Sequence, residues 1–93
     1  MVTVTIYIRK DDPVSKQAMS HVLLDDAPVA IGGEKISGIS TLDGVKYLVA
    51  DGSWLLIRPS GTEPVLRVYA EGRSAEMVQA LLGYGEKIAT RVS

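Results

Sequence analysis

The chain has 93 residues, a net charge of -1 and no cysteine, and 46% of its residues are hydrophobic. This composition indicates one small soluble globular domain and excludes disulfides, thiolate metal sites and intrinsic disorder. Because lysine and arginine are scattered, no apolar run approaches the roughly 20 residues that span a bilayer, and the N-terminus lacks the charge order of a signal peptide, we expect a cytoplasmic protein without nucleic-acid or membrane partners.

The first elements expected along the chain are a strand and a helix. Residues 3–8 read TVTIYI and alternate between polar and apolar side chains, which is the period of a half-buried strand. Asp12 can cap a helix and Pro13 suits its first position, so the sequence predicts a helix from Pro13 to about Leu24. The apolar stripe of this helix would consist of Val14, Ala18, Val22 and Leu23.

Four strands are expected next, three of them close together. Their ranges are Lys35–Thr41, Val45–Ala50, Ser53–Arg58 and Val65–Glu71. Asp-Gly pairs at residues 43–44 and 51–52 separate the first three of these strands. Asp-Gly between apolar runs favours a two-residue hairpin with positive φ at both central positions.

A second helix is expected at the C-terminal end. Ser74 can cap it, and the helical pattern continues to about Arg91. One face would carry Met77, Leu81, Tyr84, Ile88 and Val92. Gly83 and Gly85 lie inside this pattern, and each costs a helix about 1 kcal/mol relative to alanine.

The expected order β-α-β-β-β-β-α indicates an α+β fold. Two helices that cover one face of an antiparallel sheet bury the apolar sides of both kinds of element. The sequence therefore predicts a two-layer sandwich formed by a single domain, residues 1–93.

The loop before the last strand is dense in constrained and polar residues. It reads RPSGTEP, Arg58 to Pro64. Pro59 fixes φ and stiffens its neighbours, whereas Gly61 can take positive φ and leaves room for a ligand to approach. The backbone N–H groups of Ser60, Gly61 and Thr62 could then converge on one point as a nest that binds an anion.

Side chains of the loop and of the following strand supply further donors. The hydroxyls of Ser60 and Thr62 add two, Arg58 adds a planar fork that matches phosphate, and Arg67 could add a second fork. A carboxylate does not suit an anion site. We therefore expect Glu63 to point away and to pair with an arginine or to accept backbone N–H bonds.

Other interpretations of this loop are possible. The same residues suit a stiff structural turn with solvated arginines, and residue chemistry alone leaves that alternative open. A Walker-type phosphate loop is disfavoured because the chain has no GxxxxGK[ST] motif and the loop leads into a strand.

Three residues invite other functional interpretations. His21 is the only histidine, and without a partner for metal or nucleophilic chemistry it is expected at a solvated or boundary position. Trp54 precedes a core-like strand and is expected in the core or in a cleft wall. Ser60 as a nucleophile would need a base and an orienting partner, and the sequence indicates neither.

A longer segment carries a resemblance to a known family. Residues 51–72 read DGSWLLIRPSGTEPVLRVYAEG and closely resemble the C-terminal domain of the α-D-phosphohexomutases, the phosphoglucomutase/phosphomannomutase superfamily. The upstream residues 32–47, GGEKISGISTLDGVKY, and the final helix also resemble that domain. The resemblance covers nearly the whole chain, most weakly residues 1–30, and implies an α+β fold like that of the TATA-box-binding protein.

The resemblance also implies a function. In that family a phosphoserine of the first domain exchanges a phosphoryl group with a hexose phosphate, the second domain holds magnesium, and the third reads the sugar hydroxyls. The fourth domain grips the phosphate that is not being transferred. On this sequence that role would fall on Arg58, Ser60, Gly61 and Thr62, with Arg67 nearby.

The chain has no serine loop like TASHNP and no metal loop like DGDGDR. We therefore expect a fragment of a four-domain isomerase, an intramolecular phosphotransferase of carbohydrate metabolism. The fragment would bind its phosphosugar together with the other three domains, and it would have no catalytic residue, metal or cofactor of its own. The alternative is a non-enzymatic regulatory or protein-interaction domain of the same fold, in which the loop is a structural turn.

Overall fold

The computed structural model describes residues 1–92 of the chain. The elements in this range are β1 (Val2–Arg9), α1 (Lys16–Asp25), β2 (Ala30–Ile31), β3 (Glu34–Ser40), β4 (Val45–Val49), β5 (Trp54–Pro59), β6 (Val65–Gly72) and α2 (Ala75–Ala89). The expected order of elements is confirmed, with one addition. The two-residue strand β2 was not predicted, because two residues are too few to show a period.

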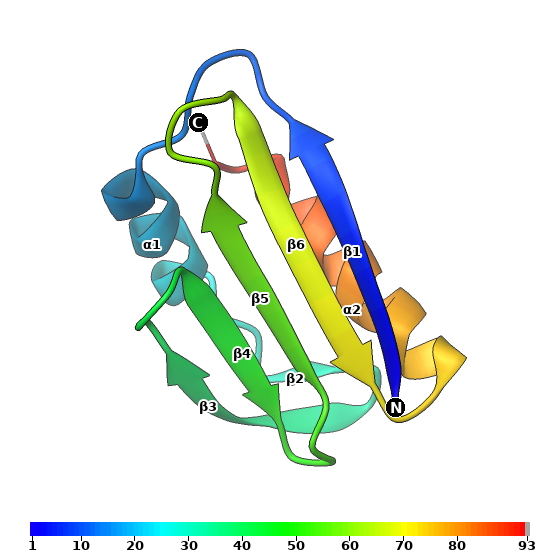
Figure 1. Cartoon of the computed structure of the whole chain (residues 1–93). Helices are drawn as coiled ribbons and strands as arrows, with labels where there is room; N and C mark the ends of the chain where they lie inside the picture. The colour runs from blue at the N-terminus through cyan, green and yellow to red at the C-terminus, as the bar shows by residue number, and fades with distance from the viewer. Residues whose placement is uncertain (93) are drawn as a thin grey trace.

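The strands form one antiparallel sheet in the order β1-β6-β5-β4-β3-β2. Both helices pack on the same face of it, α1 against β4 and β5 and α2 against β1, β5 and β6 (Figure 1). The sheet also curls, so that β2 contacts α2. These observations confirm the predicted α+β two-layer sandwich.

The core lies between the sheet and the helices. Leu55 and Ile57 of β5 and Leu66 and Val68 of β6 have no exposed surface, and they alternate with half-buried residues along their strands. This alternation leaves the other side of the sheet without a helical layer. We call that side the open face, and its residues are Thr3, Thr5, Tyr7, Arg9, Lys46, Leu48, Trp54, Leu56, Arg58, Val65, Arg67, Tyr69 and Glu71.

The start of α1 differs from the prediction. The helix begins at Lys16, and the hydroxyl of Ser15 caps it by accepting a hydrogen bond from the Ala18 N–H at 3.0 Å. The prediction that Asp12 caps the helix was wrong. Val14 is buried ahead of the helix, so the chain packs into the core before its first turn.

The apolar stripe of α1 was also predicted only in part. Met19 and Leu23 are its fully buried residues, whereas Ala18 is exposed and Val22 is half-buried. Met19 thus occupies the core position that the sequence analysis assigned to Ala18.

The two Asp-Gly turns were predicted in the right places but with the wrong backbone. Gly44 and Gly52 have φ values of 85° and 94°, but no residue other than glycine has positive φ in residues 1–92. The second turn is a three-residue loop, closed by a 3.0 Å bond from the Gly52 N–H to the Val49 carbonyl. Asp51 accepts the Ser53 N–H at 2.8 Å, and this hydrogen bond holds the pKa of its carboxyl below the usual value.

Helix α2 begins as predicted and continues through both glycines. The Ser74 hydroxyl accepts the Met77 N–H at 3.1 Å, which confirms Ser74 as the cap. Of the predicted apolar face, Met77, Leu81 and Ile88 are buried in the helix, Tyr84 is half-buried, and Val92 is buried just beyond the helix end.

Two tyrosines join the end of α1 to its neighbours, Tyr47 from β4 and Tyr84 from α2. The Tyr47 hydroxyl donates to the Leu23 carbonyl at 2.6 Å, and the Tyr84 hydroxyl donates to the Asp26 carbonyl at 2.8 Å. Their rings meet edge to face, with centroids 5.9 Å apart, and burial raises the pKa of both phenols. Both bonds satisfy carbonyl groups at the end of α1 that have no partner within the helix.

The two glycines of α2 make a matched pair for a stability measurement. Gly83→Ala is expected to stabilise the domain by about 1 kcal/mol, because alanine favours the helix and an added Cβ at Gly83 meets nothing within 4 Å. Gly85→Ala should gain less or lose stability, because its Cβ would lie 3.0 Å from Cγ1 of Val68. Urea denaturation of both variants tests this, and equal gains would contradict the close packing of α2 on β6.

Candidate phosphate-binding site

The loop that follows β5 lies at the end of the sheet where β1 also ends (Figure 1). Two backbone hydrogen bonds fix its base. The Ser60 N–H donates to the Val65 carbonyl at 3.0 Å, and the Lys10 N–H donates to the Pro64 carbonyl at 2.7 Å. The loop is thus held on one side by its own hairpin and on the other by the chain that leaves β1.

The backbone of the loop supports part of the predicted nest. The Ser60 amide is engaged with Val65, so the prediction that it joins the nest was wrong. Gly61 has a φ of 91° and an open environment, and the amides of Gly61 and Thr62 make no hydrogen bond within residues 1–92. Two of the three predicted amide donors therefore remain available, because the hairpin uses the first.

The arginines lie in one row across the open face. Arg58 is directly opposite Arg67, which in turn is directly opposite Tyr7. Like charges directly opposite each other destabilise a sheet unless something compensates them. Nη1 of Arg58 lies 3.0 Å from Oδ2 of Asp43, and the Arg58 side chain is 36% exposed. Within residues 1–92, the Arg67 guanidinium makes no ion pair or hydrogen bond.

A shallow hollow of about 390 Å³ lies beside the loop on the open face. It is lined by Tyr7, Arg9, Ser60, Glu63, Val65 and Arg67. The structure thus brings two of the predicted site residues, Ser60 and Arg67, to one hollow. Gly61 and Thr62 are exposed in the loop outside this lining, and Arg58 is turned toward Asp43.

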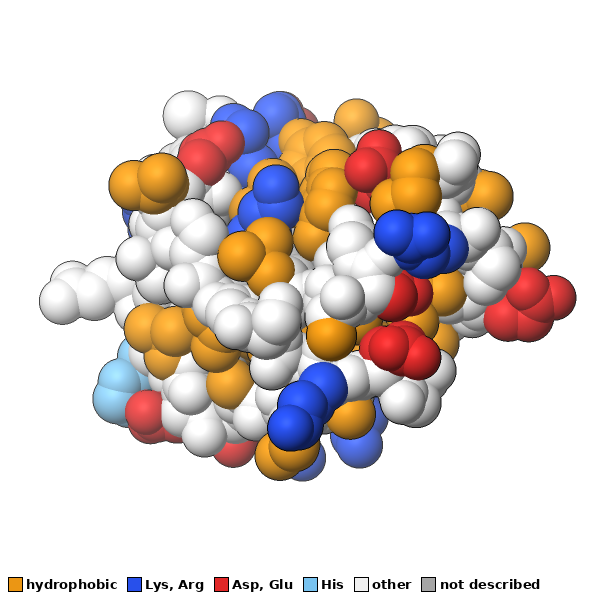
Figure 2. All heavy atoms as spheres, turned by 90° about the horizontal axis from the view of Figure 1, so that it is seen from below, with side chains coloured by type: hydrophobic (Ala, Val, Ile, Leu, Met, Phe, Trp, Pro, Cys, Tyr) orange, Lys and Arg blue, Asp and Glu red, His pale blue; other side chains and the backbone are white. Residues whose placement is uncertain are grey.

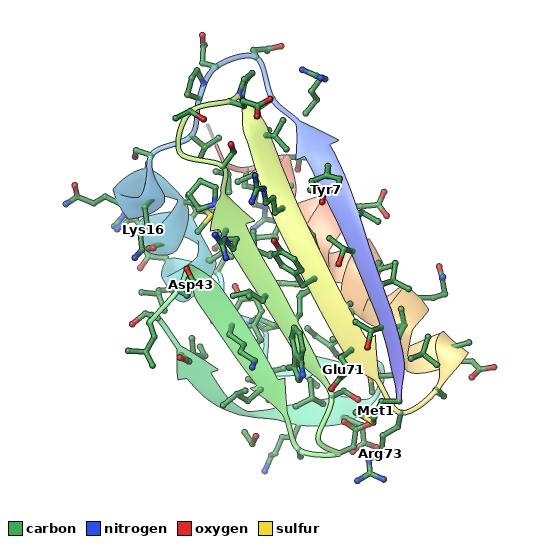
Figure 3. The ribbon with its side chains drawn as sticks, viewed as in Figure 1. Met1, Tyr7, Lys16, Asp43, Glu71 and Arg73 are labelled. Atoms are coloured by element: carbon green, nitrogen blue, oxygen red, sulfur yellow. The ribbon has the colours of Figure 1, made fainter. Side chains whose placement is uncertain are left out.

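Two lining residues, Tyr7 and Arg9, were missed by the sequence analysis. Figure 3 shows Tyr7 near the end of β1 that lies farthest from Met1, with Glu71 and Arg73 at the opposite end of the sheet. The sequence pattern that could have indicated these two residues is the polar side of the first strand, because that side must face away from the core. What the sequence did not reveal is that β1 pairs with β6, a strand more than fifty residues later.

Glu63 does not make the contacts expected of it. Its carboxylate forms no ion pair or hydrogen bond within the described part of the chain, although its N–H donates to the Ser60 hydroxyl at 3.4 Å. Instead, Glu63 lines the hollow with Ser60 and Arg67. Its negative charge therefore lies at the rim of a site whose other charges are positive.

The other residues singled out by the sequence lie outside this hollow. His21 is exposed and pairs with Asp25 at 3.1 Å, as expected for a solvated position. Trp54 is half-buried on the open face, where its Nε1–H donates to Glu71 at 3.1 Å and Nζ of Lys46 lies 4.4 Å from its ring centroid.

No metal-binding cluster of three or more histidine, aspartate or glutamate side chains occurs in residues 1–92. Neither of the described helices has the length and apolar character needed to cross a membrane. On the face shown in Figure 2, basic side chains are interspersed with acidic and apolar ones.

A family comparison identifies the domain around this site. The model described as "Phosphoglucomutase/phosphomannomutase, C-terminal domain" matches residues 9–83. The chain belongs to the phosphoglucomutase/phosphomannomutase family. The matched range contains the loop and both arginines of the row, but it leaves out all of β1 except Arg9.

Individual relatives of this mutase domain agree with the match. The chain is 55% identical over 40 residues to a probable phosphoglucosamine mutase of Methanothermobacter thermautotrophicus, covering 43% of this chain and 9% of the relative. It is 31% identical over 87 residues to a probable phosphoglucosamine mutase of Pyrococcus horikoshii, covering 94% and 19%. A phosphopentomutase of Thermococcus kodakarensis is 38% identical over 58 residues, covering 62% and 13%. The chain thus spans less than a fifth of the length of these relatives.

Proposed function

We propose that this domain binds the non-transferred phosphate of a hexose phosphate, such as glucose or mannose 1- or 6-phosphate, for a phosphosugar mutase. The observation that carries the proposal is the arrangement at the end of the open face. Arg58 and Arg67 lie directly opposite each other there, beside a loop whose Gly61 and Thr62 amides make no hydrogen bond in residues 1–92. An anion at this point would satisfy the unused donors and offset the repulsion between the arginines.

The proposed site has distinct parts. The amides of Gly61 and Thr62 and the Thr62 hydroxyl bind phosphate oxygens. Arg67 and the Ser60 hydroxyl contact the phosphate from the hollow, and Arg58 adds a guanidinium fork. For this, Arg58 must leave Asp43. An exposed ion pair contributes only about 0–1 kcal/mol, whereas a charge-assisted hydrogen bond contributes about 1.5–3 kcal/mol. The exchange of partners is therefore favourable when a phosphate dianion is present.

Binding by this domain alone is expected to be weak. Three or four charge-assisted bonds, less the several kcal/mol that association costs, leave roughly 4 kcal/mol, a dissociation constant in the millimolar range. In the proposed enzyme, the other three domains close over the ligand and supply the rest of the affinity. The reacting serine and magnesium belong to those domains, and this domain only positions the substrate.

Titration of the isotope-labelled chain with glucose 1-phosphate, followed by amide resonances in NMR spectra, tests the proposal. We expect saturable shifts in residues 58–67, above all at Gly61 and Thr62, and no such shifts with glucose. Shifts that avoid residues 58–67 at saturating ligand would contradict phosphate binding by the loop.

One observation favours a second candidate, a protein-interaction domain whose loop is a structural turn. The Ser60 amide and the Arg58 guanidinium already have partners within the domain. This candidate predicts no response of the loop to phosphate and a defined oligomer in analytical ultracentrifugation. The same titration therefore separates the two candidates.

A further inference from the structure

We infer that strand β1 forms a second wall of this site, where Arg9 binds the phosphate and Tyr7 contacts the sugar. The inference rests on the proposed function and extends it to a strand that lies outside the matched family segment except for Arg9. The ligand class is a phosphate monoester of a polyhydroxylated compound.

The register of the sheet places both residues at the site. Arg9 is directly opposite Val65, the first residue of β6, and the Val65 carbonyl accepts the Ser60 N–H at 3.0 Å. Tyr7 is directly opposite Arg67. The Arg9–Val65 and Tyr7–Arg67 pairs are neighbours on the open face of β1 and β6. The four side chains therefore line the same hollow of about 390 Å³. The wall opposite the loop is therefore made by β1.

The hydrogen-bonding groups at the two ends of the open face differ. At the far end, Glu71 accepts hydrogen bonds from the Thr3 hydroxyl at 3.0 Å and from Trp54 Nε1–H at 3.1 Å, so donors and acceptors are matched. At the loop end, the guanidinium groups of Arg9 and Arg67 make no ion pair or hydrogen bond in residues 1–92. The loop end therefore carries two guanidinium groups with unused donors, and the carboxylate of Glu63 lines the same hollow.

Tyr7 provides the less polar part of the same wall. Tyr7 is 68% exposed although it is paired with Arg67 in the sheet. A phenol ring beside a guanidinium offers a flat surface for the C–H groups of a sugar ring and a hydroxyl for its oxygens. Arg9 and Tyr7 therefore suit the two chemical halves of one phosphosugar.

Variants of the labelled chain, titrated with glucose 1-phosphate and separately with inorganic phosphate, test the inference. Arg9→Ala should weaken binding of both ligands at least about threefold, and Arg9→Lys should restore part of the loss because it keeps the charge. Tyr7→Ala should weaken only glucose 1-phosphate. In the wild type, the side-chain Nε–H resonance of Arg9 should shift on binding.

Arg73→Ala is the matched control, because Arg73 is an exposed arginine at the opposite end of the same sheet (Figure 3). It should bind both ligands as the wild type does. If residues 60–62 respond to phosphate while Arg9→Ala binds as tightly as the wild type, the inference is wrong and the proposed function stands. If neither the loop nor β1 responds, the proposed function fails and the inference fails with it.

Discussion

Replacing Arg58 with alanine in the proposed full-length mutase is expected to raise KM for the hexose phosphate and to lower kcat, with kcat/KM falling about tenfold or more. The loss of one charge-assisted bond of about 1.5–3 kcal/mol sets this scale. Turnover should fall along with affinity, because the bound phosphate positions the one that reacts. Steady-state kinetics with glucose 1-phosphate measures both parameters.

Asp43→Asn is the control for this variant. Both substitutions break the Arg58–Asp43 ion pair, but only Arg58→Ala removes the guanidinium. The Asp43 variant should therefore bind phosphosugar at least as well as the wild type, because Arg58 no longer has a competing partner. Wild-type values of KM and kcat for Arg58→Ala would show that Arg58 does not anchor the substrate.

Gly44→Ala is expected to cause the largest loss of stability among the glycine substitutions considered for this domain. Gly44 has a φ of 85°, and an added Cβ would lie 2.5 Å from the Ile57 carbonyl oxygen and 2.8 Å from Cβ of Arg58. The positive φ costs about 1–2 kcal/mol for alanine, and overpacking typically costs about 1–3 kcal/mol more. We expect a total of about 3 kcal/mol in the free energy of unfolding, measured by urea denaturation.

Gly61→Ala separates strain from packing. Gly61 has a similar φ of 91°, but its added Cβ would meet nothing within 4 Å. Gly61→Ala should therefore lower the free energy of unfolding only by the cost of backbone strain, about 1–2 kcal/mol. Equal losses at Gly44 and Gly61 would contradict the close approach of the β3–β4 turn to β5. That approach also brings Asp43 beside Arg58, so the turn and the site are coupled.

The sequence predicted the sheet well because its strands are strongly patterned. The alternation from Trp54 to Pro59 and from Val65 to Gly72 places one side in the core, and the turns lie where the Asp-Gly pairs indicated. The cap of α1 was missed because Asp12 and Ser15 are both good capping residues. In the structure Val14 is buried ahead of the helix, and the Ser15 hydroxyl accepts the Ala18 N–H, so the cap is Ser15.

The candidate site could be predicted only where it is local in the sequence. The loop residues and Arg67 lie close together along the chain and follow a recognisable pattern. Tyr7 and Arg9 reach the site through the pairing of β1 with β6, which depends on the topology of the whole sheet. The use of the Ser60 amide by the hairpin and of Arg58 by Asp43 likewise depends on register and on side-chain packing.

The most direct measurement is a crystal structure of the chain grown with glucose 1-phosphate well above its dissociation constant. Our account requires phosphate oxygens within hydrogen-bonding distance of the Gly61 and Thr62 amides and of at least one guanidinium from Arg58 or Arg67. A phosphosugar seated elsewhere, with those two amides still facing solvent, would contradict it.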